Sequence, residues 1–151
     1  AELTRLQRIV KDFNILVGVK GQISNGPLLA SEEFGIGGMS YGYGRGYDPS
    51  EILGDEGVVG KLEVQWNTHV FDEHITSLQL FGFYDVGAVW NDDPTTPADK
   101  RNSVASVGLG ARARLTQAIN ADATLAFPMT KDVDTQDDTD PRLFVSLTSR
   151  F

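Results

Sequence analysis

One arginine stands near the middle of the most glycine-rich stretch of this sequence. Residues 31–60 read SEEFGIGGMSYGYGRGYDPSEILGDEGVVG, and Arg45 is their only basic residue. Glycine allows positive φ and a close approach of the backbone to other groups. The stretch can therefore enter a confined space and present Arg45 at its tip. The alternative is a flexible surface loop whose arginine is solvated.

Asp85 is one carboxylate that an arginine inside a barrel can pair with. It lies on the more polar side of an alternating segment, 78–90, and a barrel built from such segments would direct it inward. A guanidinium can give a carboxylate two parallel hydrogen bonds. Removing one partner of a buried pair costs about 3–5 kcal/mol, because the other charge is left uncompensated. The alternative is that Asp85 caps a turn.

No arrangement of residues predicts catalysis. We find no Ser/His/Asp order, no nucleophile elbow and no carboxylate pair suited to glycoside hydrolysis. The glycine-rich stretch lacks the GxxxxGK[ST] pattern of a phosphate-binding loop. The chain has no Cys, which excludes disulfide frameworks, zinc ribbons and thiol catalysis. We therefore expect no enzyme activity and no cofactor.

Two groups of possible metal ligands are weak. Asp132, Asp134, Asp137, Asp138 and Asp140 lie in one segment, and oxygen-rich loops can bind Ca²⁺. The glycine and terminal glutamate of an EF-hand are missing there, which favours a solvated acidic loop. The second group is a predicted turn, in which two histidines flank two acidic residues without a spacing that converges on a metal: His69, Asp72, Glu73 and His74. We expect no metal.

Composition sets the outer bounds of the interpretation. The 151 residues carry a net charge of −8, which suits one domain and argues against a nucleic-acid binder. No run approaches the roughly 18 apolar residues of a transmembrane helix. A transmembrane β-barrel remains compatible, because it places its apolar residues at every second position.

Apolar and polar residues alternate along most of the chain, which predicts β-strands. In one segment Val58, Gly60, Leu62, Val64 and Trp66 alternate with Val59, Lys61, Glu63, Gln65 and Asn67. The pattern predicts six strands at roughly 13–24, 57–68, 77–91, 103–115, 119–130 and 142–151. Residues 2–9 are expected to be the remnant of a seventh, with residues 10–13 as its turn.

The lengths of these segments favour a membrane barrel over a soluble sandwich. Strands of soluble sheets usually have about 5–6 residues, whereas transmembrane strands need about 9–11. The connections alternate between long and short, as extracellular loops and periplasmic turns do, and 25–56 is a long glycine-rich loop. Trp66 and Trp90 stand at strand ends on the apolar side, where an interfacial aromatic girdle would place them.

Several motifs, in order along the chain, resemble the transporter subunits of two-partner secretion. These are the haemolysin-activator proteins of the ShlB/FhaC/HecB, or TpsB, family within the BamA superfamily. The matching stretches are GRGYDPSEILGDEGVVGKLEVQW, LQLFGFYDVGAVW, SVGLGARARL, ADATLAFPM and RLFVSLTSRF. The resemblance covers essentially the whole chain.

The resemblance implies that residues 1–151 are the C-terminal part of a sixteen-stranded outer-membrane barrel. Periplasmic POTRA domains precede this barrel in the family, and we expect none within this chain. The implied loop tip is Gly44, Arg45, Gly46 and Tyr47, with Asp85 as its ion-pair partner in the lumen. The implied supporting strand motifs contain Phe83, Tyr84, Gly87, Gly108 and Gly110. The family usually has Val at the position of Gly44.

The final strand resembles the signal read by the barrel-assembly machinery. Phe151 is the last residue, and Val145 and Leu147 precede it on the same side of the strand. An ordinary final strand would show the same alternation, and the two interpretations are compatible.

We therefore predict an all-β, antiparallel meander of six or seven long strands from an outer-membrane β-barrel. The predicted function is translocation of a TpsA-like exoprotein from the periplasm to the cell surface. The polar path would be lined by Lys61, Glu63, Arg112, Arg114, Asp122 and Arg150. Outer-membrane lipid, the assembly machinery and the exoprotein are the expected partners, with an oligomer if the fragment is expressed alone. The alternatives are a BamA-type assembly factor, a passive pore and a soluble β-sandwich binding module.

Overall fold

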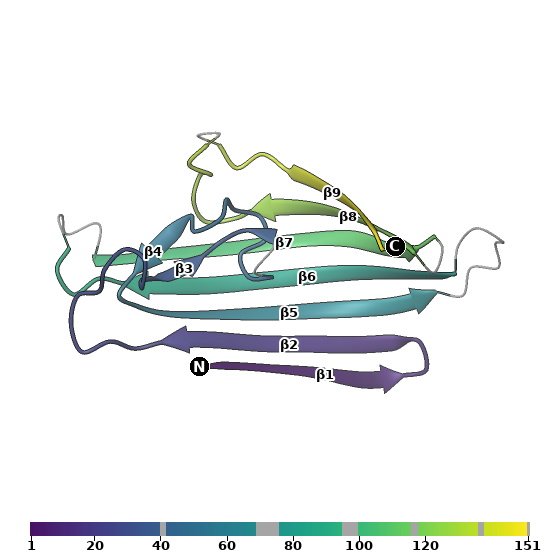
Figure 1. Cartoon of the computed structure of the whole chain (residues 1–151), viewed down its shortest axis with the longest axis horizontal. Coiled ribbons are helices and arrows are strands. Elements are labelled where there is room, and N and C mark those ends of the chain that lie inside the picture. Colours follow the sequence, from purple (N-terminus) through teal and green to yellow (C-terminus); the bar gives the residue numbers. More distant parts are fainter. Residues whose placement is uncertain (40–41, 69–75, 95–99, 116–117, 136–137, 151) are drawn as a thin grey trace.

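Seven long strands form one curved antiparallel sheet (Figure 1). The computed structural model describes residues 1–39, 42–68, 76–94, 100–115, 118–135 and 138–150. Within them the strands are β1 (Glu2–Val10), β2 (Phe13–Gln22), β3 (Phe34–Ile36), β4 (Ile52–Gly54), β5 (Glu56–Thr68), β6 (Ser77–Trp90), β7 (Arg101–Arg114), β8 (Ile119–Pro128) and β9 (Arg142–Ser149). This part of the chain contains no helix suited to crossing a membrane.

The order of the large sheet is β1-β2-β5-β6-β7-β8-β9, so each long strand pairs with the long strands before and after it. This confirms the predicted all-β antiparallel meander. The described sheet is open, with β1 and β9 at its edges. The segment near the N-terminus is more than a remnant, because β1 has nine residues and pairs with β2 along its length.

The structure also corrects the prediction inside the long loop. Residues 34–36 and 52–54 pair as a second, two-stranded sheet, β3-β4. The sequence pattern predicts this stretch only as part of one long loop. Three residues are too short to show an alternation that can be recognised in a sequence. In Figure 1 this small sheet lies over one face of the large one. We call that face, which carries Asp85, the inner face and the opposite one the outer face.

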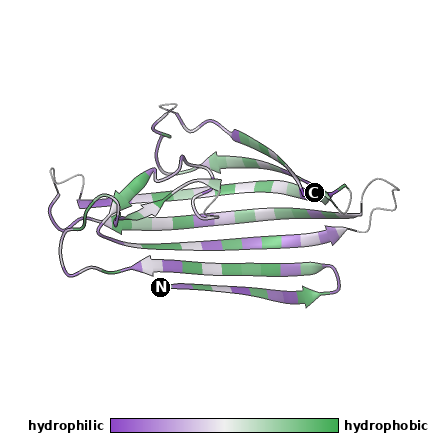
Figure 2. Ribbon diagram, viewed as in Figure 1, coloured by the Kyte–Doolittle hydropathy of each residue, from purple (hydrophilic) through white to green (hydrophobic). Residues whose placement is uncertain are grey.

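Large apolar side chains are exposed on the outer face of β1, β2, β5, β6, β7 and β9. The bands of alternating hydropathy are visible along β5 in Figure 2. Its exposed members include Leu3, Val17, Val19, Val58, Leu62, Val64, Trp66, Leu80, Tyr84, Val86, Val107, Leu109, Leu143, Val145 and Leu147. Trp66 stacks on Phe13 with 5.9 Å between ring centroids. Trp90 lies at the opposite end of the sheet, because it pairs with Glu56 at the start of β5.

On the inner face, two phenylalanines lie over two glycines of the next strand. Phe83 pairs with Gly108, and Phe81 pairs with Gly110. A Cβ at Gly108 would lie 2.5 Å from the Phe83 ring, and a Cβ at Gly110 would lie 2.4 Å from the Phe81 ring. The glycines thus leave space for both rings, which are buried and form an apolar floor.

The long loop packs its own apolar residues against the inner face. The buried cluster contains Phe34, Ile36, Tyr43, Tyr47, Ile52, Val59, Val89, Val104 and Val133. Glycines again provide the space, because a Cβ at Gly57 would lie 2.2 Å from Phe34 and one at Gly87 would lie 2.7 Å from Ile36. The loop is therefore seated on the sheet by close packing.

This packing predicts the effect of adding one methyl group to the floor. Gly108→Ala should lower the free energy of unfolding by about 1–3 kcal/mol, the usual cost of overpacking. Its Cβ would meet both the Phe83 ring and the carbonyl oxygen of Leu125 at 2.5 Å. Urea unfolding of the full-length protein that contains this segment measures the change.

Gly82→Ala is the matched control for this experiment. Gly82 pairs with Leu109 in the same two strands, but a Cβ there would lie 3.8 Å from its nearest neighbour. Equal unfolding midpoints for the two variants would contradict the proposed role of Gly108.

Candidate functional site

Arg45 and Asp85 meet at the centre of the inner face. The Nε and Nη2 atoms of Arg45 donate hydrogen bonds to the two Asp85 oxygens at 2.9 and 2.8 Å. The backbone N–H of Arg45 donates a third at 3.0 Å. Asp85 is fully buried, and Arg45 is 4% exposed. The fork of the guanidinium and the loop backbone thus hold the same carboxylate.

A second carboxylate completes the environment of Arg45. Its Nη1 donates a hydrogen bond to Oε2 of Glu63, which is 1% exposed. The guanidinium carbon lies 3.7 Å from the centroid of the Phe83 ring, a cation–π distance. Sequence reasoning placed Glu63 on the polar path and did not pair it with Arg45. The strand register would have indicated the contact between Glu63 and Arg45, because Glu63 pairs with Phe83, which is two residues from Asp85.

Glu63 is shared between two arginines. Arg112 donates to its Oε1 at 2.7 Å and to its Oε2 at 3.2 Å. Arg112 also donates to Gln79 at 2.9 Å, forms an ion pair with Asp122 at 3.4 Å and lies 3.8 Å from the Phe81 ring centroid. The site therefore contains the same stack twice, in which an arginine lies over a phenylalanine ring and the ring lies over a glycine. Glu63 connects the arginines of the two stacks. We call the group of Arg45, Asp85 and Glu63 the latch.

Backbone conformation brings the loop tip to the latch. Gly44 has a φ of 68°, a region where β-branched residues are strained. A Cβ at Gly44 would also lie 3.1 Å from Ile36 Cγ2. This gives a local reason why Val is absent from the position. Gly46 is close to β7, because its N–H donates to Ser106 at 3.3 Å and a Cβ would meet Ser106 at 2.8 Å.

Tyr47 fixes the residue that follows the tip. Its hydroxyl donates to the carbonyl oxygen of Ala105 at 3.0 Å. The Tyr47 hydroxyl oxygen also accepts hydrogen bonds from the backbone N–H groups of Met129 and Thr130 at 3.3 and 3.2 Å. Tyr47 is 1% exposed. The side chain thus binds the backbone just beyond β8.

The structure places the other predicted residues in different ways. Lys61 lies over the Tyr43 ring, 4.3 Å from its centroid. Tyr84, Val145 and Leu147 are exposed on the outer face, and Arg150, beyond the end of β9, is exposed. Phe151 lies outside the described residues, as do Asp137 and the predicted turn with its two histidines and two acidic residues.

Two acidic side chains of the segment after β8 have partners within that segment. Lys131 pairs with Asp134 at 2.9 Å, and the backbone N–H of Asp140 donates to Asp138 at 3.1 Å. Among the described residues, no group of three acidic, histidine or cysteine side chains could hold a metal ion.

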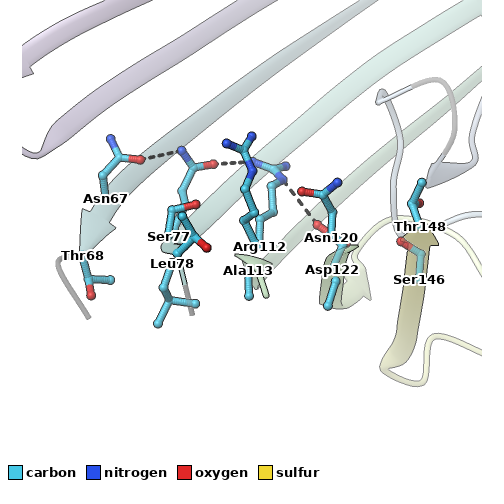
Figure 3. A pocket seen from close by; sticks show the side chains of 14 residues that line it. Asn67, Thr68, Ser77, Leu78, Arg112, Ala113, Asn120, Asp122, Ser146 and Thr148 are labelled. Carbon is cyan, nitrogen blue, oxygen red and sulfur yellow. Dashed lines mark hydrogen bonds and ion pairs between the residues drawn. The ribbon is translucent and has the colours of Figure 1, made fainter. Parts of the chain in front are cut away.

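A polar cavity of about 570 Å³ lies beside Arg112, at the end of the sheet where β5 ends and β6 begins (Figure 3). In Figure 3 the side chains of Arg112, Asn120 and Asp122 face the same space. The lining also includes Asn67, Gln79, Arg114, Ser146 and Thr148. Three of the residues predicted for a polar path, Arg112, Arg114 and Asp122, thus line one space.

Known proteins resemble this chain over most of its length. The family model described as Haemolysin secretion/activation protein ShlB/FhaC/HecB matches residues 4–113. The heme/hemopexin transporter protein HuxB of Haemophilus influenzae (strain 86-028NP) is 26% identical over 137 residues, which cover 89% of this chain and 24% of that protein.

The fold also has a solved counterpart. CdiB from Acinetobacter baumannii superposes with a TM-score of 0.70 at 20% identity, over 98% of this chain and 26% of that one. The chain therefore spans about a quarter of the length of the relatives that it matches.

The latch predicts unequal effects for two carboxylates. Asp85→Asn should release the loop tip, because loss of one member of a buried ion pair costs about 3–5 kcal/mol. Asp122→Asn should change little, since exposed pairs contribute about 0–1 kcal/mol and the Asp122 side chain is 29% exposed. Trypsin provides the measurement, because Arg45 is the only basic residue between 31 and 60 and is buried when docked. Faster cleavage after Arg45 in Asp122→Asn than in Asp85→Asn would refute this prediction.

The conformation of Gly44 predicts the effect of the residue that the family usually has there. Gly44→Val should loosen the tip, since a β-branched residue at positive φ costs about 1–3 kcal/mol. Gly44→Asn should loosen it less, because Asn tolerates this region. The same trypsin assay tests both variants, and a Val variant that is cleaved no faster than the parent would contradict the expectation.

Proposed function

The chain belongs to the ShlB/FhaC/HecB family of haemolysin secretion/activation proteins, and from this premise we propose that it is part of an outer-membrane β-barrel that moves an exoprotein to the cell surface. The family is one of secretion and transport proteins. The substrate would be a TpsA-like partner exoprotein, and no catalytic step is needed. The location would be the bacterial outer membrane.

The latch is the observation that carries this proposal. A loop tip that is buried against the inner face by Arg45, Asp85 and Glu63 would occupy the interior of a closed barrel. The interior would then contain a movable obstacle fixed by ionic contacts. Transport would require the tip to hold one defined position and to leave it when the exoprotein passes.

The outer face supports a lipid environment. Its large apolar side chains are exposed on six of the seven long strands, and no second sheet covers them in the described part of the chain. This arrangement argues against the soluble β-sandwich, in which such a face is packed. An unpaired strand edge is not tolerated in lipid, because its backbone groups would lack hydrogen-bond partners. The edges at β1 and β9 would therefore be paired by strands from elsewhere in the full-length protein, or by a second copy.

The inner face supports a polar passage. Lys61, Arg112 and Arg114 lie on it, and the cavity beside Arg112 is lined largely by amides and hydroxyls. An unfolded polypeptide exposes backbone donors and acceptors that such groups can bind weakly.

For barrel assembly, we propose that Val145, Leu147 and Phe151 form the C-terminal signal.

A secretion assay tests the proposed function. In the full-length protein, Arg45→Ala and Asp85→Ala should each lower the amount of exoprotein in the medium, because the tip loses its position. The barrel should remain inserted in the outer membrane. Lys100→Ala, in an exposed connection, is the control and should secrete normally.

Two results would count against the proposal. Normal secretion by both latch variants would remove the role of the latch in transport. Normal secretion together with a loss of other outer-membrane proteins would instead support a BamA-type assembly factor.

A further inference from the structure

The long loop makes a second set of contacts, separate from the latch, with the connection between β8 and β9. Asp48 accepts a hydrogen bond from Nη2 of Arg142 at 2.6 Å on one oxygen. Its other oxygen accepts from the Thr135 hydroxyl at 2.6 Å. Asp48 lies three residues after Arg45 in the long loop, whereas Arg142 is the first residue of β9. These contacts therefore join two segments that are distant in sequence.

Glu51 strengthens the same junction from the loop side. Its side chain is fully buried. One oxygen accepts from the backbone N–H of Asp134 at 2.9 Å and pairs with Lys131 at 3.2 Å. The other oxygen accepts from the backbone N–H of Asp48 at 3.2 Å. Glu51 thus connects the loop to the β8–β9 connection and also holds the backbone of Asp48.

We name this group of Asp48, Glu51, Lys131, Thr135 and Arg142 the clasp. None of its members belongs to the latch, and Tyr47 separates Arg45 of the latch from Asp48 of the clasp in sequence. The hydrogen bond from Thr135 lowers the pKa of the Asp48 carboxyl; burial opposes this, and the contact with Arg142 adds to it. Asp48 is therefore charged at neutral pH, as an ion pair requires.

The Asp48–Arg142 pair of the clasp is weaker than the latch in two respects, its solvent exposure and its hydrogen bonding. The side chains of Asp48 and Arg142 are 20% and 15% exposed, against 0% and 5% for Asp85 and Arg45. Solvent access weakens an ion pair. The Nη1 atom of Arg142 is buried without a hydrogen-bond partner among the described residues, and such an atom is unfavourable. The latch, by contrast, engages three nitrogens of the Arg45 side chain.

We propose that the clasp is a second fastening of the loop, that it opens before the latch, and that Arg142 is its positioning residue. The inference rests on the proposed function, since it describes how the obstacle in the passage is released. Opening of the clasp frees the segment around β4 from the β8–β9 connection. The tip stays on Asp85 until a second event breaks the latch.

Cysteine labelling in the full-length protein tests this proposal without reference to secretion. This segment has no native Cys, and Ile52 in β4 is 3% exposed. In an Ile52→Cys background, Arg142→Ala should raise the labelling rate with a membrane-impermeant maleimide by about fivefold, which corresponds to about 1 kcal/mol for loss of an ion pair with solvent access. Cleavage by trypsin after Arg45 should stay slow, because the latch is intact.

Four variants make the result specific. Arg150→Ala removes an exposed arginine beyond the other end of β9 and should leave labelling unchanged. Arg142→Lys keeps the charge and should label more slowly than Arg142→Ala. The exchange of Asp48→Arg with Arg142→Asp should return the rate toward that of the parent. Ile23→Cys, at a residue that is 89% exposed, provides the rate for an open site and should not change.

The outcomes separate this inference from the proposed function. Slow labelling in Arg142→Ala, or an exchange that does not restore protection, would overturn the clasp. Fast labelling together with fast cleavage after Arg45 would show one cooperative fastening and overturn the proposed order. Normal secretion by the Arg45→Ala and Asp85→Ala variants would refute the transport role, while the labelling result would still decide whether the clasp exists.

Discussion

Burial of the Arg45 guanidinium is the constraint on which the rest of the structure depends. An arginine can be buried only where fixed acceptors replace the water that it loses. Asp85 and Glu63 supply these acceptors from adjacent strands, and Phe83 supplies a ring face. A tip docked elsewhere would leave the buried Asp85 carboxylate without its guanidinium partner, whereas Glu63 would keep its contacts with Arg112. The ion pairs therefore specify where the loop docks more clearly than they add stability.

The glycines follow from the same constraint. Asp85 and Glu63 can meet the loop only if the neighbouring rings lie flat against the sheet, and Gly108 provides the space for Phe83. The repeat of this arrangement at Gly110, with Arg112 above, extends the polar layer beyond the latch. A composition rich in glycine thus reflects close packing between the loop and the sheet. It does not indicate a flexible segment.

The loop is also a folded element in its own right. It contains the β3-β4 pair, buries Ile36 and Ile52, and contacts the β8–β9 connection through Asp48 and Glu51. The β3-β4 pairing is internal to the loop, whereas Ile36 and Ile52 share their buried cluster with Val59, Val89 and Val104 of the large sheet. The loop is therefore held in place by apolar packing as well as by its ion pairs.

The sequence by itself determined the strands and their two faces, because a period of two is a local property of neighbouring residues. It also identified Arg45 and Asp85, since the family motifs are short and contiguous. Only the tertiary structure decided that Glu63 is shared by two arginines and that Arg142 reaches Asp48. These contacts join residues from strands and loops far apart in the chain. Their geometry depends on register and sheet curvature, which no single segment encodes.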